Sequence, residues 1–136
     1  NSWFEFHRRI MAGFPYSVLG KFTQGLRILP RDRILKFVYV HEVAWRDYRD
    51  RTGRRRLTMN QSGRLWIIAE TLAFATVCLG GKRKAEEWLL HTCGPEEEAL
   101  FRGITGYQPM ELLETSVGQD IVRELLRVRR ESAPPS

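Results

Sequence analysis

The residues best able to do chemistry are few and lie far apart along the chain. The three histidines are His7, His41 and His91, and none has a serine or cysteine at a spacing typical of an activated nucleophile. Cys93 is two residues from His91, a spacing that does not place two side chains on one face of a helix. The sequence also has no glycine-rich phosphate loop and no nucleophile elbow. We therefore expect no enzyme, no metal site and no cofactor.

An acidic run, Glu96-Glu97-Glu98, follows the dipeptide Gly94-Pro95. Adjacent carboxylates can hold a metal ion or act as acid and base. The alternative is a solvated first helical turn, where negative charge is favoured by the helix dipole, and the sequence favours this alternative. The two cysteines, Cys78 and Cys93, fall in expected helical segments. We expect both to be buried thiols in a reducing cytoplasm rather than a disulfide.

Basic residues are concentrated in the first half of the chain. Residues 1–56 contain 13 Lys/Arg and 5 Asp/Glu, a net charge of +8, whereas residues 57–136 have a net charge of −2. Six arginines fall between positions 46 and 56. A guanidinium group suits phosphates and guanine edges better than an ammonium does. This asymmetry predicts a polyanionic partner for the first half and a protein partner for the second.

Helix signals recur along the chain and strand signals are scarce, so the expected fold is all-α. The expected helices cover residues 3–11, 14–24, 30–37, 40–48, 59–79, 82–91, 96–101, 110–114 and 117–130. No apolar run reaches the length of a membrane span, so we expect no membrane-crossing helix and a cytoplasmic protein.

The strongest helix should begin at a capping box formed by Thr58 and Gln61. Its main apolar stripe is Leu65, Ile68, Leu72 and Ala75, and apolar residues beside this stripe predict burial on several sides. We expect both halves of the chain to pack on this helix.

A second capping box, Ser116 with Gln119, should open the last helix. Gly118 in the first turn of that helix implies the close approach of another backbone.

Two short helices at residues 30–37 and 40–48, joined by a tight turn, are typical of a helix-turn-helix. The second helix of that motif enters the DNA major groove by its N-terminal residues. Residues 1–56 are therefore the expected DNA-binding region, and residues 57–136 the protein-binding domain. The alternative is a solvated basic surface that binds no DNA, since Glu42, Asp47 and Asp50 weaken the positive field. The candidate DNA contacts are His41, Trp45, Arg46, Arg49, Arg51, Arg54, Arg55 and Arg56.

The second half of the chain resembles the toxin-binding domain of the Xre/MbcA/ParS antitoxins. The matching positions are Lys84-Ala85, Trp88-Leu89, Pro109, Leu112-Leu113, Thr115, Gly118, Val122 and Leu125-Leu126. Residues 57–70 are similar to the segment that leads into this domain, and residues 14–45 more loosely resemble the helix-turn-helix of the same family. The resemblance implies a helix-turn-helix packed on a helical toxin-binding domain.

The resemblance also implies the partners: a RES-domain toxin that degrades NAD, operator DNA, and a second copy of the chain in a homodimer. The resemblance further implies that the chain is not catalytic and that its C-terminal region covers the mouth of the toxin's active site. The toxin-facing residues implied by position are Trp88, Gly103, Tyr107, Gln108, Pro109, Met110, Arg127, Arg129 and Arg130. The chain departs from the family at the end of the last helix, where Arg129-Arg130-Glu131-Ser132 replaces a glycine and a short apolar tail.

Two other functions fit the same sequence. One is a stand-alone transcription regulator whose C-terminal domain only dimerises it. The other is a helical scaffold that binds protein and no DNA.

Overall fold

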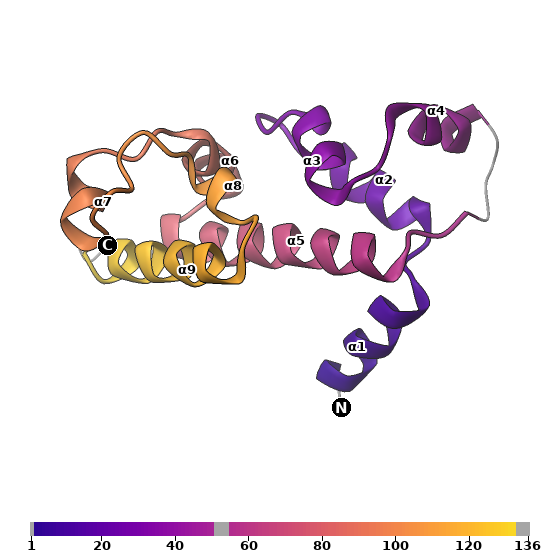
Figure 1. The fold of residues 1–136 in the computed structure, drawn as a ribbon, viewed down its shortest axis with the longest axis horizontal. Coiled ribbons are helices and arrows are strands. Elements are labelled where there is room, and N and C mark those ends of the chain that lie inside the picture. Colours follow the sequence, from indigo (N-terminus) through magenta and orange to yellow (C-terminus); the bar gives the residue numbers. More distant parts are fainter. Residues whose placement is uncertain (1, 51–54, 133–136) are drawn as a thin grey trace. The chain divides into compact units, whose positions relative to one another are not determined.

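The computed structural model describes residues 2–50 and 55–132, which form nine α-helices and no β-strand (Figure 1). An isolated antiparallel bridge joins Pro15 and Arg56. The expected all-α fold is confirmed. The chain divides into two compact units, Asn1–Leu26 with Pro30–Ala69, and Arg27–Leu29 with Glu70–Ser136. The division falls within one helix, whereas the charge pattern suggested a functional boundary at residue 56.

Unit 1 contains α1 (Ser2–Ala12), α2 (Tyr16–Gln24), α3 (Arg31–Val38), α4 (Glu42–Asp50) and the first part of α5 (Met59–Leu79). Leu19, Ile34, Val38, Leu65 and Ile68 are almost fully buried and form its core. They lie at the helical spacing expected from the sequence, which is why these segments fold as helices that share one apolar centre.

The turn between α3 and α4 depends on a residue with left-handed backbone. Tyr39 has a φ of 64°, and the amide of Val40 donates to the carbonyl of Leu35 at 2.9 Å. The side chain of Gln61 donates to the carbonyl of Tyr39 at 2.9 Å. Gln61 also forms the predicted capping box with Thr58, with N–H···O distances of 2.9 and 3.1 Å. One side chain therefore both starts α5 and holds the turn before α4.

Unit 2 contains the rest of α5, together with α6 (Lys82–Leu90), α7 (Pro95–Leu100), α8 (Pro109–Leu112) and α9 (Ser116–Glu131). Leu72, Leu89, Leu113, Val122 and Leu126 are buried in its core. The last helix, α9, runs beside the C-terminal part of α5 (Figure 1), and Arg123 of α9 pairs with Glu70 of α5 at 2.7 Å.

The N-cap of α9 is Thr115, one of the two residues expected to cap this helix, and its hydroxyl accepts from the amide of Gly118 at 2.9 Å. The capping box expected from Ser116 and Gln119 is not formed. The side chain of Gln119 donates instead to the carbonyl of Leu113 at 2.9 Å. The close backbone approach predicted at Gly118 is confirmed, because a Cβ there would lie 1.7 Å from the carbonyl oxygen of Leu112.

Length and composition alone would allow α5 to cross a membrane, although the sequence predicted no such segment. The predicted stripe of Leu65, Ile68, Leu72 and Ala75 is buried, and these side chains supply core residues to the two units. The apolar character of α5 is thus used in packing within the chain.

Candidate functional site

The loop between α7 and α8 in unit 2 has a backbone fixed by the segment that follows α6. The amide of Cys93 donates to the carbonyl of Tyr107 at 2.8 Å, and the amide of Gly106 donates to the carbonyl of Cys93 at 3.0 Å. The side-chain amide of Gln108 donates to the carbonyl of Leu90 at 2.8 Å. These bonds hold residues 106–108 against residues 90–93.

A carboxylate from α7 holds the other side of this loop. Glu98 accepts from the amide of Gly103 at 2.6 Å, and from the amide and hydroxyl of Thr105 at 3.0 and 2.6 Å. The hydroxyl of Thr105 and these amides hold the pKa of Glu98 below its usual range. The acidic run lies in the first turn of α7, as predicted. In addition to this position, Glu98 holds the loop, and Glu97 accepts from the amide of Gly94 at 2.9 Å.

The loop places some of the predicted toxin-facing residues at the surface and others beneath it. Tyr107 is 52% exposed, and Gly103 is exposed with open space around it. Gln108 is half-buried. In contrast, Trp88 is only 7% exposed, and Pro109 and Met110 are buried. These three buried residues can support the loop but cannot present a side-chain face to a partner.

The three candidate arginines near the end of α9 differ in their surroundings. Arg127 binds the carboxylates of Glu124 and Glu131 on its own helix, and these bonds raise the pKa of its guanidinium above the usual value. The side chains of Arg129 and Arg130 are exposed, and among the described residues neither side chain makes a hydrogen bond or ion pair, although the charge of Arg129 helps to lower the pKa of Glu97. Arg129 and Arg130 are therefore better placed than Arg127 to reach a partner.

The predicted DNA-reading residues of unit 1 are also divided by the structure. Trp45 is 4% exposed and packs beside Tyr48, with ring centroids 5.5 Å apart, so its indole belongs to the core. His41 uses its Nδ1 to accept from the amide of Val43 at 3.2 Å, which caps the start of α4. Arg46 is exposed and pairs with Glu42 at 3.3 Å.

The arginines beyond α4 contribute less free positive charge than the sequence suggested. Arg55 pairs with Asp47 at 3.7 Å, and Arg56 donates to the carbonyl of Gly13 at 2.8 Å. Arg51, Arg54 and the side chain of Arg49 lie outside the described part of the chain.

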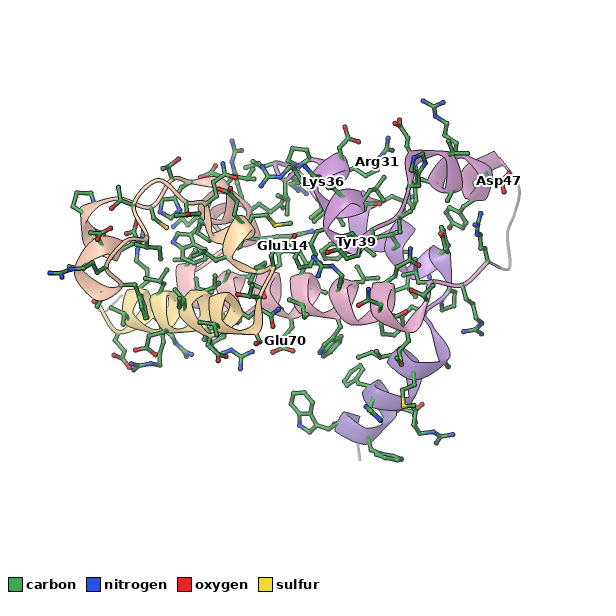
Figure 2. The ribbon with its side chains drawn as sticks, viewed as in Figure 1. Arg31, Lys36, Tyr39, Asp47, Glu70 and Glu114 are labelled. Atoms are coloured by element: carbon green, nitrogen blue, oxygen red, sulfur yellow. The ribbon has the colours of Figure 1, made fainter. Side chains whose placement is uncertain are left out.

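The structure does bring together two helices and a tight turn, and α3 adds cations that the sequence analysis did not select. Arg31 and Lys36 lie on α3 with exposed side chains (Figure 2). The signal for Lys36 was its position on the face of α3 away from Ile34 and Val38, whereas Arg31 begins the apolar face and is exposed in the first turn of the helix.

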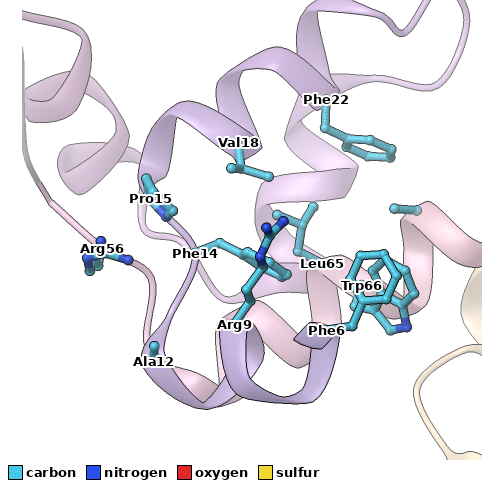
Figure 3. Close-up of a pocket in the computed structure, with 11 residues that line it drawn as sticks. Phe6, Arg9, Ala12, Phe14, Pro15, Val18, Phe22, Arg56, Leu65 and Trp66 are labelled. Atoms are coloured by element: carbon cyan, nitrogen blue, oxygen red, sulfur yellow. The ribbon is translucent and has the colours of Figure 1, made fainter. Parts of the chain in front are cut away.

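An apolar pocket of about 520 Å³ lies between α1, α2 and α5 within unit 1 (Figure 3). Phe6 of α1 and Trp66 of α5 form one wall, with ring centroids 4.5 Å apart, and Val18 and Phe22 of α2 form another. No residue of α1 is fully buried. The first helix is thus formed as predicted, but it borders a hollow rather than closing the core.

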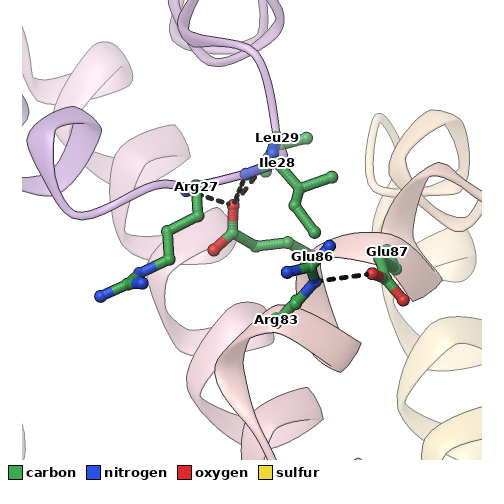
Figure 4. A network of polar contacts seen from close by, with 6 residues as sticks. All are labelled: Arg27, Ile28, Leu29, Arg83, Glu86 and Glu87. Atoms are coloured by element: carbon green, nitrogen blue, oxygen red, sulfur yellow. Dashed lines mark hydrogen bonds and ion pairs between the residues drawn. The ribbon is translucent and has the colours of Figure 1, made fainter.

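A buried carboxylate that was not among the residues selected from the sequence organises unit 2 (Figure 4). Oε1 of Glu86 accepts from the amides of Arg27, Ile28 and Leu29, each at 2.9 Å. Glu86 is 0% exposed, and its Oε2 has no hydrogen-bond partner among the described residues. In the sequence, the spacing of Glu86 from Ala85 and Leu89 places it on the inward face of α6. This spacing was the signal from which its burial could have been predicted.

Comparison with known proteins identifies the family. No family model matches the chain. The protein named Antitoxin Xre from Pseudomonas putida (strain KT2440) is 34% identical over 125 residues, which is 90% of this chain and 69% of the relative. Antitoxins are not enzymes, in agreement with the expectation from the sequence. This chain belongs to the Xre antitoxin family and is the antitoxin component of a toxin–antitoxin system.

Proposed function

We propose that this antitoxin neutralises a RES-domain, NAD-degrading toxin in the cytoplasm by covering the mouth of the toxin's active site. The toxin-facing surface consists of the exposed residues of loop 103–108 and the exposed arginines at the end of α9. The observation that carries the proposal is the anchoring of this loop by Glu98, Cys93 and Leu90. A loop already fixed in one conformation loses less entropy on binding, so more of its contact energy appears as affinity.

Within this surface, Tyr107 and the arginine pair have different roles. Tyrosine offers a large amphipathic side chain with few rotatable bonds, which is typical of residues that dominate an interface. Arg129 and Arg130 can form charge-assisted hydrogen bonds with acidic groups in a cleft built for an anionic dinucleotide. The alternative for these arginines is that they only complement the dipole at the C-terminus of α9.

The partner is tested by co-expression with the product of the neighbouring open reading frame, which the proposal expects to be a RES-domain toxin. The toxin alone should deplete cellular NAD and stop growth, and the wild-type chain should restore both. Tyr107→Ala should weaken the purified complex by about 2 kcal/mol, roughly 30-fold in Kd. Val117→Ser is the control, because Val117 is exposed at the opposite end of α9. A neighbour that stays toxic beside the wild-type chain contradicts the proposed partner.

We further propose that unit 1 binds operator DNA, which would make the complex a repressor of its own operon. Support comes from the α3–turn–α4 arrangement, from the excess of positive charge in residues 1–56, and from the exposed cations Arg31, Lys36 and Arg46. We expect these cations to contact mainly the DNA phosphates. Two candidate base-reading residues are poorly placed, because Trp45 is buried and Arg46 is partly neutralised by Glu42.

The DNA-binding proposal predicts a gel shift with the operon's promoter that weakens steeply as salt rises. Each lost phosphate contact should reduce the slope of log K against log salt by about 0.9. The double variant Arg31→Ala/Lys36→Ala should therefore lower this slope by about 2, whereas Arg83→Ala in unit 2 should leave it unchanged. A stand-alone regulator would give the shift without binding the toxin. A protein-only scaffold would give no shift at low salt.

A further inference from the structure

Three potential metal ligands of different chemistry meet in unit 2, where the chain passes from α6 to α7. The ligand atoms of His91, Cys93 and Glu97 all lie within 4.8 Å of one another. Nε2 of His91 is 3.1 Å from Oε1 of Glu97. Cys93 is 1% exposed, whereas His91 and Glu97 are partly open to solvent. His91 and Cys93 are two residues apart, and their side chains can meet because the backbone at His91 is extended. Alternate residues of an extended segment lie on the same face.

The hydrogen bonds around His91 turn its Nε2 toward the carboxylate of Glu97. Nδ1 lies 2.6 Å from the carbonyl oxygen of Trp88, which can only accept, so Nδ1 carries a proton. In the neutral ring Nε2 then has a lone pair, and it faces a carboxylate oxygen that already accepts from Gly94. Two acceptors face each other unless a proton or a metal ion lies between them. A histidine that donates one N–H to a backbone carbonyl and turns its other nitrogen to a ligand set is typical of metal sites.

We propose that His91, Cys93 and Glu97 form a Zn²⁺ site. A thiolate, an imidazole and a carboxylate are the ligand types that Zn²⁺ takes, and three protein ligands leave a fourth tetrahedral position. Ligand atoms about 2.0–2.3 Å from zinc lie roughly 3.3–3.6 Å from one another, so small side-chain movements close the site. The thiolate and the carboxylate together balance the charge of the ion.

Solvent can reach the site from a surface pocket, and the negative charge of Glu97 acts on the Cys93 thiol. His91 lines a surface pocket of about 650 Å³ that also includes Glu87, Glu96, Lys84 and Arg129. The fourth ligand position can be filled by water from this side. Burial, together with the charge of Glu97, raises the pKa of the Cys93 thiol, so metal binding must release the thiol proton. The backbone of Cys93 also holds Tyr107 and Gly106, so an ion at this site ties down the base of the loop. The metal site itself does not depend on the identity of the toxin.

The test uses the whole purified chain after chelator treatment, with Co²⁺ as a spectroscopic probe and Zn²⁺ as the competitor. Co²⁺ should bind once per chain with a thiolate-to-cobalt charge-transfer band, and Zn²⁺ should displace it and raise the Tm. Cys93→Ser should abolish this band, and His91→Gln should weaken metal binding at least about 10-fold. Cys78→Ser is the matched control, because Cys78 is the other buried free cysteine and should leave binding intact.

A second measurement covers the case in which Cys93→Ser does not fold. In the wild-type chain Zn²⁺ should protect Cys93 from alkylation, located by peptide mass spectrometry, and should not change the labelling of Cys78. His91→Gln should remove the protection. The proposal is overturned if Co²⁺ shows no thiolate band, if the band survives in folded Cys93→Ser, or if Zn²⁺ does not protect Cys93.

Discussion

A Gly118→Ala variant is expected to lose at least about 3 kcal/mol of folding stability, which is above the usual effect of overpacking by one methyl group. The added Cβ would lie 1.7 Å from the carbonyl oxygen of Leu112 and 2.7 Å from its carbon. Both atoms belong to the backbone, so no side-chain rotation can relieve the overlap. The N-terminus of α9 would have to move away from α8.

That movement also breaks the cap of α9, because the amide of Gly118 donates to Thr115. Urea denaturation followed by circular dichroism measures the loss. Gly63→Ala is the matched control, since Gly63 also lies inside a helix and a Cβ there would meet only the side chain of Ile10, at an ordinary 3.9 Å. Equal stability of Gly118→Ala and wild type would show that α9 does not approach α8 as described. If the loss is as expected, toxin binding should fall with it.

The second large effect is expected at Glu86. Glu86→Ala leaves three amides without their acceptor, and a buried unpaired amide costs about 1–3 kcal/mol. A total loss of about 3 kcal/mol or more is therefore expected. Glu86→Gln keeps the shape and one acceptor oxygen but removes the charge, and we expect a loss of about 2 kcal/mol because charge-assisted hydrogen bonds are roughly twice as strong.

The control for Glu86 is its neighbour on the same helix. Glu87 is exposed and pairs with Arg83 at 3.1 Å (Figure 4). A surface ion pair of this kind contributes little, so Glu87→Gln should change stability by about 0.5 kcal/mol or less. Similar effects at the two positions would contradict the network drawn around Glu86.

Acid titration gives an independent readout of the same network. Burial disfavours the charged form of Glu86, but the amides of Ile28, Leu29 and Arg27 and the charge of Lys82 together hold its pKa below the usual 4.5. A lowered folded-state pKa means that the ionised group stabilises the protein above pH 4.5, and that this contribution is lost as the pH falls through the folded-state pKa. The stability difference between wild type and Glu86→Gln should therefore shrink below pH 4.5. If the stability difference stays constant down to strongly acidic pH, the lowered pKa of Glu86 is contradicted.

Several features of this antitoxin were determined by the sequence itself. The capping box of Thr58 and Gln61 and the stripe from Leu65 to Ala75 predicted α5 and its buried face. These signals are local, since an N-cap acts within one turn and an apolar stripe repeats every three to four residues. Gly118 was similarly readable, because a glycine inside a helical turn has few explanations other than close packing.

Tertiary structure decided where the polar and aromatic side chains point. Trp45 occupied a predicted reading position of the helix-turn-helix, but it is buried beside Gly20 of α2 and beneath the guanidinium of Arg31 of α3. Glu86 received its partners from residues 27–29, which are nearly sixty positions away in the chain. Helical periodicity gives the face on which a residue lies, but it does not give the distant backbone that meets that face.

The candidate sites show the same division. The sequence and its family resemblance selected loop 103–108 and the end of α9, but only the structure showed that Glu98 holds the loop and that Arg127 is engaged by Glu124 and Glu131. The spacing of two residues between His91 and Cys93 argued against a shared site, because such residues do not lie on one face of a helix. The cluster with Glu97 forms because the chain is extended, not helical, at His91. Local spacing rules hold only for the conformation they assume, and the chain leaves the helical conformation where α6 ends.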